Sequence, residues 1–471
     1  MTQRAPTLKK GGREMRSSRT FIAAGQLALL TLALASCGRQ AVPEAPVGQV
    51  TPETTAAQPG TQPAQATTAQ IMTVSVRAGT TEADLLSRYP GSRVLALHAS
   101  EGYAQLLSTG ATVAAPAMGS LSLNAQLLTV TDTEPDLTLA TSVIDDIAIA
   151  QGNTAWAGGN TAWAGGNTAW AGGTGTGGSI NALAANAPAW AKLDLGNGQK
   201  LAPLLGQGIK VAVLDTGIDI AHPAFAGHLD VASGWDYVGG DATPQEVNWS
   251  SSGYSASYGH GTAVAGVILQ VAPNATIVPF RVLNPNGSGR LSNIIMAVND
   301  ATKYGAKVIN MSLGTTTASV ALSVAIKSAI SSGVMVVASS GNSGDSNVSY
   351  PARYAPDMQL ALGGGLISVG SISLDDKKSS FSTCGLSLDI LAPGEAVATT
   401  FPNSQRTTAT GTSFAAPMVS GAVALAMSNG RTNVVALYKS IRASATAPTD
   451  PLFWSQMGSG TLNIGKLMVT P

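Results

Sequence analysis

The sequence predicts an α/β protein in which a mostly parallel sheet carries helices on both faces, preceded by a small α+β domain. From residue 200 onward, apolar runs rich in β-branched residues alternate with helical stretches. The predicted strands are 209–217, 276–283, 306–314, 334–342 and 366–373. Helices are predicted at 292–305 and 319–333. Continuous apolar strands that alternate with helices are typical of a parallel sheet buried on both faces. Such sheets place ligand chemistry at the carboxyl ends of their strands, so residues there are the first candidates for a site.

Residues 71–150 predict the small α+β domain. The stretch "IMTVSVRAG" (71–79) alternates like a strand, and "SRVLALHAS" (92–100) does the same. Between them, "TTEADLLSRYPG" (80–91) begins with a threonine cap and closes at Pro-Gly, as a short helix does. A further strand is expected at 120–130. The pattern is strand, helix, strand, strand.

Two stretches predict linkers. Residues 38–70 consist mainly of Pro, Gln, Thr and Ala, which offer little to bury. Residues 151–199 include three copies of a seven-residue unit that carry Trp156, Trp163 and Trp170. Glycines at both ends of each unit and the lack of paired apolar heptad positions exclude a coiled coil there. We interpret this segment as a linker; the alternative is that the tryptophans form a ligand-binding strip.

Residues 1–37 predict an export signal. A basic leader is followed by an apolar run that ends at Cys37 and is too short to span a membrane comfortably. The last four residues of this run, "LASC", resemble a bacterial lipobox, in which the cysteine is lipid-modified and becomes the new N-terminus. An ordinary secretion signal is the alternative, because small residues also mark its cleavage site. Met15 offers a second start, which would give a signal of more usual length.

Composition excludes one class of partner. The formal net charge is zero and only 11% of the residues are charged. No basic repeat or patch interleaved with aromatic residues supplies a local electrostatic footprint for nucleic acid. We therefore expect no nucleic-acid partner.

Four polar residues stand at strand ends or at helix starts. Asp215 closes "VAVLDTG" and Asn342 closes the strand at 334–342, whereas His260 in "YGHGTAVAGV" and Ser413 in "GTSFAAP" open helices. Taken singly, such residues are commonly caps, turn formers or packed side chains. Taken together, they supply what acyl transfer needs: a hydroxyl nucleophile, an imidazole to take its proton, a carboxylate to hold the imidazole, and a donor for the oxyanion.

The order Asp, His, Asn, Ser, in the motifs "DTG", "HGT", "GN" and "GTSFAAP", resembles the subtilisin-like serine protease family (subtilases, peptidase family S8). The resemblance covers residues 200–471 and implies a subtilisin-like fold and serine endopeptidase activity. It implies that Ser413 is the nucleophile, His260 the general base and then acid, and Asp215 the residue that orients His260. The side chain of Asn342 and the main-chain N–H of Ser413 would form the oxyanion hole.

The resemblance also implies where substrate binds. An extended peptide would add as a strand between two edges and meet residues Gly287, Ser288, Gly289, Ser312, Leu313 and Gly314. The primary pocket would be walled by Leu313 and by residues 338–341, which include Ser340 and Gly341, with Ser349 near its base. These segments carry no acidic residue, so an apolar or broad preference is expected rather than a basic one.

Two departures from the family concern cations. Between His260 and "VAPNA" (271–275) the chain is short where calcium-binding subtilisins carry a longer loop of oxygen ligands, so that calcium site should be missing. The stretch "DMQLALGGGL" (357–366) is longer than usual, which puts any weaker cation site there in doubt. We expect no metal ligands and no cofactor.

Residues 71–150 resemble, more weakly, the inhibitory propeptide of this family. The expected protein is thus an exported serine endopeptidase that acts on proteins or peptides and processes its own precursor by a cut at 150–200. Its partners are its own propeptide and, through lipidated Cys37, the bacterial membrane. Two alternatives stay open: the small domain is a permanent one, or the chain is a catalytically inactive subtilase that serves as a surface binding module.

Overall fold

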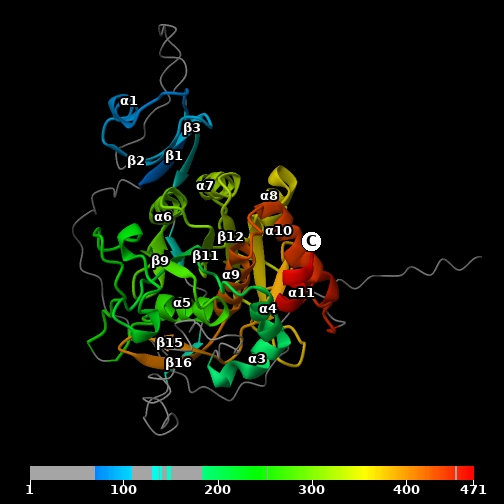
Figure 1. Ribbon diagram of the computed structural model, residues 1–471. Helices are drawn as coiled ribbons and strands as arrows, with labels where there is room; N and C mark the ends of the chain where they lie inside the picture. The colour runs from blue at the N-terminus through cyan, green and yellow to red at the C-terminus, as the bar shows by residue number, and fades with distance from the viewer. Residues whose placement is uncertain are drawn as a thin grey trace, which may run out of the picture. The chain divides into compact units, whose positions relative to one another are not determined.

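The computed structural model describes residues 69–108, 130–136, 138–140, 146–149, 183–251, 253–450 and 453–471 (Figure 1). The predicted signal with Cys37, almost all of the linker at 38–70, and the tryptophan repeats lie outside the described residues. Within the described ranges, no helix is long and apolar enough to cross a membrane.

The central feature is a seven-stranded parallel sheet, which confirms the predicted fold class. Its order is β14-β13-β12-β11-β7-β9-β8, and every neighbouring pair runs parallel. The strands are β7 (Lys210–Asp215), β8 (Trp235–Asp236), β9 (Thr276–Arg281), β11 (Val308–Met311), β12 (Met335–Ser339), β13 (Leu366–Ile372) and β14 (Ile390–Pro393). The five strands predicted from apolar runs are all present, because each run is long enough to be buried on both faces.

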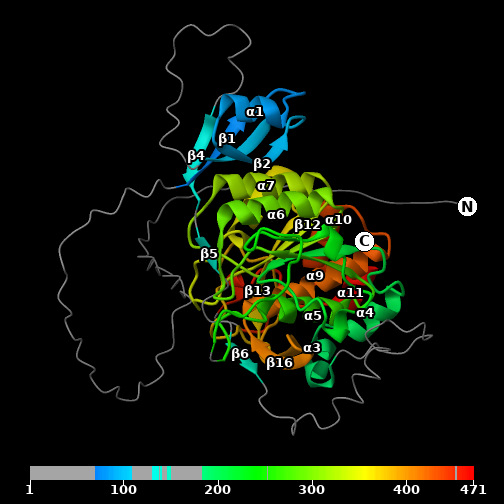
Figure 2. The same cartoon turned by 90° about the vertical axis from the view of Figure 1, so that its left-hand side faces the viewer.

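Helices cover both faces of this sheet. Figure 2 shows α6 (Leu291–Lys303) and α7 (Val320–Ser331) on one side of β12 and β13, and α5 (His260–Val271) and α9 (Thr412–Ser428) on the other. Every residue of α5 is buried, and so is every residue of α9 up to Met427. A helix that is apolar all round belongs in a core. The two helices that begin at His260 and near Ser413 are therefore held by packing on all sides.

Residues 183–201 correct the predicted linker boundary. They form η1 (Ala184–Asn186), α3 (Ala187–Lys192) and α4 (Leu195–Leu201). Trp190 and Leu193 are buried in the main core, and the carbonyl of Leu193 accepts a 2.7 Å hydrogen bond from the N–H of Ile464 at α11 (Ile464–Val469). The described residues 183–199, predicted as part of the linker, therefore pack into the main core.

Two further helices of the peptidase region are α8 (Ala355–Leu362) and α10 (Val434–Ser444). Within the stretch 357–366, α8 continues to Leu362 and is capped by Gly363, whose φ of +85° suits glycine.

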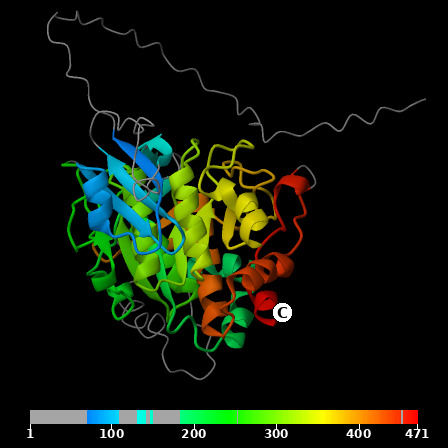
Figure 3. The ribbon, with the colours of Figure 1, turned by 90° about the horizontal axis from the view of Figure 1, so that it is seen from above.

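The small domain has an antiparallel sheet of order β2-β3-β1-β4, coloured blue to cyan in Figure 3. Its elements are β1 (Gln70–Ser75), α1 (Glu82–Arg88), β2 (Ser92–His98), β3 (Tyr103–Ser108) and β4 (Val130–Pro135). Thr81 is the N-cap of α1, at the threonine cap expected from the sequence, and it forms a capping box with Asp84. Most of the strand expected at 120–130 lies outside the described residues.

Two short strands after β4 pair with strands of the peptidase region. β5 (Thr138–Ala140) runs antiparallel to β10 (Ser288–Arg290). β6 (Asp146–Ile149) runs antiparallel to β16 (Gln405–Thr410), which pairs in turn with β15 (Val397–Phe401). One stretch of chain thus adds a strand to two different sheets.

Candidate active site

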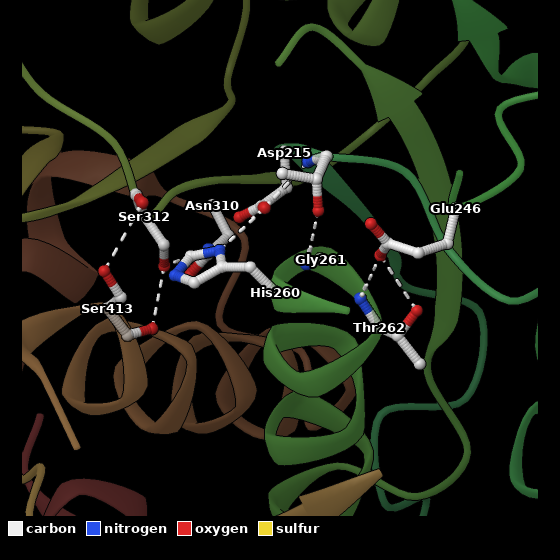
Figure 4. A network of polar contacts seen from close by, with 9 residues as sticks. Asp215, Glu246, His260, Gly261, Thr262, Asn310, Ser312 and Ser413 are labelled. Atoms are coloured by element: carbon white, nitrogen blue, oxygen red, sulfur yellow. Dashed lines mark hydrogen bonds and ion pairs between the residues drawn. The ribbon is translucent and has the colours of Figure 1, made fainter. Parts of the chain in front are cut away.

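Asp215 and His260 form a buried pair. Asp215 is the last residue of β7 and His260 the first of α5. The Nδ1 of His260 lies 2.7 Å from Oδ1 of Asp215, and both side chains are 1% exposed (Figure 4). A Cβ added to Gly261 would meet the carbonyl oxygen of Gly217 at 2.1 Å, so glycine at 261 lets α5 start against the loop that follows β7.

Hydrogen bonds to Thr216 fix the geometry of this pair. Oδ1 of Asp215 also accepts a 2.8 Å bond from the N–H of Thr216. The hydroxyl oxygen of Thr216 accepts a 2.9 Å bond from the N–H of Gly261, the second residue of α5. With Nδ1–H donated to the carboxylate, the lone pair of the imidazole is on Nε2, which is the nitrogen that can take a proton.

Glu246 is a buried acid beside this pair that the sequence analysis missed. Its Oε2 accepts bonds from Thr262, 3.0 Å from the hydroxyl and 3.3 Å from the main-chain N–H. The N-cap of α5 is Gly259, which has no side chain to serve these donors, so Glu246 caps the helix from outside it. Burial, with a smaller contribution from the charge of Asp215, raises the pKa of Glu246 to about 7. No motif marks Glu246, because its partner is 16 residues away.

Ser413 lies in the first turn of α9. It is fully buried, and its hydroxyl donates to the main-chain carbonyl of Ser312 across 3.4 Å. The ring of the next residue, Phe414, has its centroid 5.4 Å from that of His260. The structure therefore brings the start of α9 to the start of α5, and Figure 4 draws Ser413, Ser312, His260 and Asp215 as one cluster.

Asn342 follows β12 and contacts the residue before Ser413. Its Oδ1 accepts two bonds from Thr412, 2.9 Å from the N–H and 2.8 Å from the hydroxyl. The hydroxyl of Thr412 in turn accepts a 3.3 Å bond from the N–H of Gly341. Because the carbonyl end of the Asn342 amide is held by Thr412, the other end presents N–H donors.

The predicted substrate-binding segments lie in and before β10 and directly after β11. Ser288 and Gly289 belong to β10, and Gly287 precedes them at a φ of +81°. Residues 312–314 follow β11, where Leu313 is fully buried. The edge of β10 is already paired with β5, so in this chain it receives an extended strand.

The predicted pocket segments meet around Ser349. A Cβ on Gly314 would lie 2.9 Å from the Cβ of Ser349, and one on Gly341 would lie 2.6 Å from its hydroxyl. The N–H of Ser349 donates to the carbonyl of Ser340 across 2.9 Å. Gly314, Ser340 and Gly341 thus come together from separate strands, and glycine at 314 and 341 permits the close approach.

The described part of the chain holds no group of three or more His, Cys, Asp or Glu residues arranged to bind a metal ion. The absence of metal ligands and cofactors stays an expectation from the sequence.

Comparison with known proteins gives a family. Residues 206–460 match the Subtilase family (Peptidase_S8). The chain is 42% identical over 231 residues to Subtilisin BL of Lederbergia lenta, an alignment that covers 47% of this chain and 77% of that protein. It is 39% identical over 236 residues to Thermitase of Thermoactinomyces vulgaris, covering 48% and 77%. It is also 42% identical over 231 residues to an alkaline protease of Alkalihalobacillus alcalophilus, of which only 54% is covered.

Proposed function

Because the chain belongs to the subtilase family of serine endopeptidases, we propose that it hydrolyses peptide bonds with Ser413, His260 and Asp215 as its catalytic triad. The observation that carries this assignment is the buried 2.7 Å contact between His260 and Asp215 at the start of α5, next to the first turn of α9. The site has the imidazole oriented with Nε2 as its acceptor, as a general base requires.

The proposed reaction has two steps. The oxygen of Ser413 attacks the substrate carbonyl as its proton moves to Nε2 of His260, and the carboxylate of Asp215 stabilises the imidazolium. His260 then gives this proton to the leaving amine, and the C–N bond breaks to leave an acyl-enzyme. A water molecule repeats the sequence: it loses a proton to His260, attacks the ester, and releases the acid as Ser413 regains its proton.

The oxyanion of each tetrahedral intermediate would be met by two donors. One is the Nδ2 of Asn342, whose orientation is set by the bonds from Thr412 to Oδ1. The other is the main-chain N–H of Ser413 at the positive end of the α9 dipole. Donors held in place before the reaction cost no reorganisation when charge develops.

Substrate would bind as an extended strand on β10, as β5 does within the chain. Main-chain pairing tolerates many sequences. The predicted pocket segments 312–314 and 338–341 contain no acidic residue, which supports an apolar or broad preference at the residue before the cut.

The small domain fits the role of an inhibitory prosegment. Glu134 accepts bonds at the N-terminus of α7 from the hydroxyl of Ser319 at 2.8 Å, the N–H of Val320 at 3.0 Å and the N–H of Ala321 at 2.8 Å. Asp136 accepts from the N–H and hydroxyl of Ser292 at the start of α6, at 2.8 and 2.9 Å. Carboxylates at helix N-termini satisfy donors that the helix leaves over and complement its dipole.

Strand pairing favours a self-cleavage site earlier in the chain than the range 150–200 predicted from the sequence. β5 lies on β10 at one substrate edge, and β6 lies on β16, which ends three residues before Ser413. We therefore place the cut after Ala140 and before Asp146, rather than at 150–200. The tryptophan repeats would then stay on the catalytic part.

Export and a lipid anchor at Cys37 rest on the sequence alone, because the predicted signal and Cys37 lie outside the described residues. If Cys37 is the anchor and the cut falls before Asp146, self-cleavage separates the anchor from the catalytic part and releases the enzyme.

The proposal is tested with wild-type chain and Ser413→Ala. Wild type should hydrolyse casein, label with a fluorophosphonate at Ser413, and yield a fragment that by intact mass begins between residues 141 and 146. Ser413→Ala should do none of these and keep the full precursor in the membrane fraction. Cleavage of Ser413→Ala at the same bond would reject self-processing. Absence of hydrolysis and labelling in wild type would favour the inactive binding module.

A further inference from the structure

Helix α9 contains a proline close to the nucleophile. Pro417 lies four residues after Ser413 and has no N–H. In an uninterrupted helix the N–H at 417 would donate to the carbonyl of Ser413, and a proline ring also crowds that carbonyl. The main-chain carbonyl of Ser413 therefore needs a donor from outside the helix, in a region where every neighbour is buried.

Ser312 is that donor. Its hydroxyl donates to the carbonyl of Ser413 across 2.9 Å (Figure 4). Ser312 is itself fully buried and follows β11, so its position is fixed by the central sheet rather than by α9. The contact ties the turn that carries the nucleophile to the carboxyl end of a strand.

Two further side chains orient the Ser312 hydroxyl. The Nδ2 of Asn310 donates to it across 3.0 Å, and the Oδ1 of Asn310 accepts from the hydroxyl of Ser420 across 2.8 Å. All three side chains are fully buried. Since the Ser312 oxygen accepts from Asn310, its single proton is directed to Ser413. The four groups form a chain of donors that runs in one direction, from Ser420 to the Ser413 carbonyl.

We propose that Ser312 is a positioning residue for Ser413: its hydroxyl replaces the helical N–H that Pro417 lacks, and Asn310 and Ser420 orient it. This rests on the proposed function, in which Ser413 supplies both the attacking oxygen and one oxyanion donor. A turn that loses this bond moves both groups at once. Because the main-chain atoms of Ser312 that meet substrate are kept in Ser312→Ala, the loss should appear in kcat rather than in KM.

A double-mutant cycle tests the assignment. Ser312→Ala should lower kcat by roughly 10- to 100-fold, the range that a small misplacement of reacting groups costs, with KM within about twofold. Pro417→Ala restores an N–H at the position where the helix would provide it. In the double variant that N–H can bond the Ser413 carbonyl, so most of the lost kcat should return. Such recovery is a coupling between contacting sites that loss of packing at Ser312 would not produce.

Controls keep the outcome clear. Ser440→Ala removes a buried helical hydroxyl that bonds the carbonyl of Ala436 and should leave kcat unchanged. Ser420→Ala, a milder change at the far end of the chain of donors, should lower kcat less than Ser312→Ala. Rates are expressed per site titrated by fluorophosphonate, and thermal unfolding checks that each variant is folded.

Two results would overturn the inference while the proposed function stands: wild-type kcat in Ser312→Ala, or a folded double variant with no recovery. If Ser312→Ala does not fold, a wild-type kcat in Ser420→Ala also counts against it. A wild-type protein without hydrolysis would reject the proposed function and this inference together.

Discussion

His260 and Asp215 are joined by a 2.7 Å contact between Nδ1 and Oδ1, with both side chains 1% exposed. At this burial no water can replace the carboxylate, so the contact with Asp215 favours the tautomer that carries its proton on Nδ1. The contact links the end of β7 to the start of α5, and its geometry depends on the sheet rather than on a loop.

Asp215→Asn should therefore keep the fold and lower kcat by about 10⁴, because an amide can donate to Nδ1 and favour the tautomer that cannot act as base. Steady-state kinetics on a peptide substrate measures the loss. Asp230→Asn, which removes the charge of a partly exposed pair with Lys210, is the matched control and should retain activity. Similar rates in the two variants would remove Asp215 from the mechanism.

Asn342→Ala should lower kcat by about 10² to 10³ and leave KM nearly unchanged, the usual loss for one oxyanion donor. The control is Asn429→Ala, at the other end of α9, where the side chain bonds the carbonyl of Leu201. Because Asn342 also accepts from Thr412, the thermal midpoint is measured in parallel to separate a shifted α9 from a missing donor. A wild-type kcat would show that another group meets the oxyanion.

These residues also show how far the sequence alone reaches. The positions of Asp215 at the end of β7 and of Asn342 shortly after β12 were predictable, because a polar residue after a continuous apolar run marks the carboxyl edge of a buried strand. That His260 meets Asp215 across 45 positions came only from the family resemblance. The role of Glu246 had no local signal, because it depends on a tertiary contact with Thr262.

The boundaries of the peptidase region were harder to predict for a similar reason. Residues 183–201 follow a glycine-rich repeat and are short, but Trp190 and Leu193 are buried in the main core, and Leu193 bonds Ile464 of α11, more than 250 residues later in the chain. The pairing of β5 with β10, and of β6 with β16, leaves no periodic signal in strands of three and four residues.

Stability should depend on pH through two buried acids. Burial raises the pKa of Glu246 from 4.5 to about 7 and that of Asp389 from 3.8 to about 6. Between each unfolded and folded pKa, the folded protein holds a proton that the unfolded chain has lost. The stabilisation that these protons contribute is complete below the unfolded pKa and falls as pH rises through the folded pKa.

Glu246→Gln should remove this slope between pH 4.5 and about 7, since its amide still accepts from Thr262 but does not ionise. Its thermal midpoint relative to wild type should be higher at pH 8 than at pH 5. Asp389→Asn should show the same trend in a lower window, up to about 6. Parallel wild-type and Glu246→Gln curves across this range would contradict the raised pKa.

A chelator should change stability little. The chain runs from α5 to β9 through only the four residues 272–275, without the long loop that holds calcium in calcium-binding subtilisins. Without a tightly bound ion there is no stabilisation by mass action for EDTA to remove. Differential scanning calorimetry with EDTA and with added calcium makes the comparison, and a large fall in thermal midpoint that calcium reverses would reveal a site elsewhere.

The final prediction concerns how the prosegment is held after the cut. Glu134 makes three bonds to the first residues of α7, and bonds to a charged acceptor contribute more than neutral ones. Glu134→Ala leaves two main-chain donors at Val320 and Ala321 without this acceptor and should weaken retention of the cleaved segment by at least about tenfold. Progress curves recorded after processing is complete measure this. Wild-type precursor should show a lag before hydrolysis begins, and the Glu134→Ala variant should show a shorter lag.

Glu82→Ala is the matched control and should keep the wild-type lag. Glu82 is an acid in the first turn of α1 rather than at the N-terminus of α7. Glu101→Ala should lie between the two, because Glu101 makes one 3.0 Å contact with Ser328 of the same helix and is partly exposed. Intact mass must show the same cut in all variants, so that a change in lag reports release rather than cleavage. An unchanged lag and undiminished co-purification of the segment in Glu134→Ala would mean that the small sheet is retained by its apolar contacts, such as those of Ile71 and Leu95 with the main core.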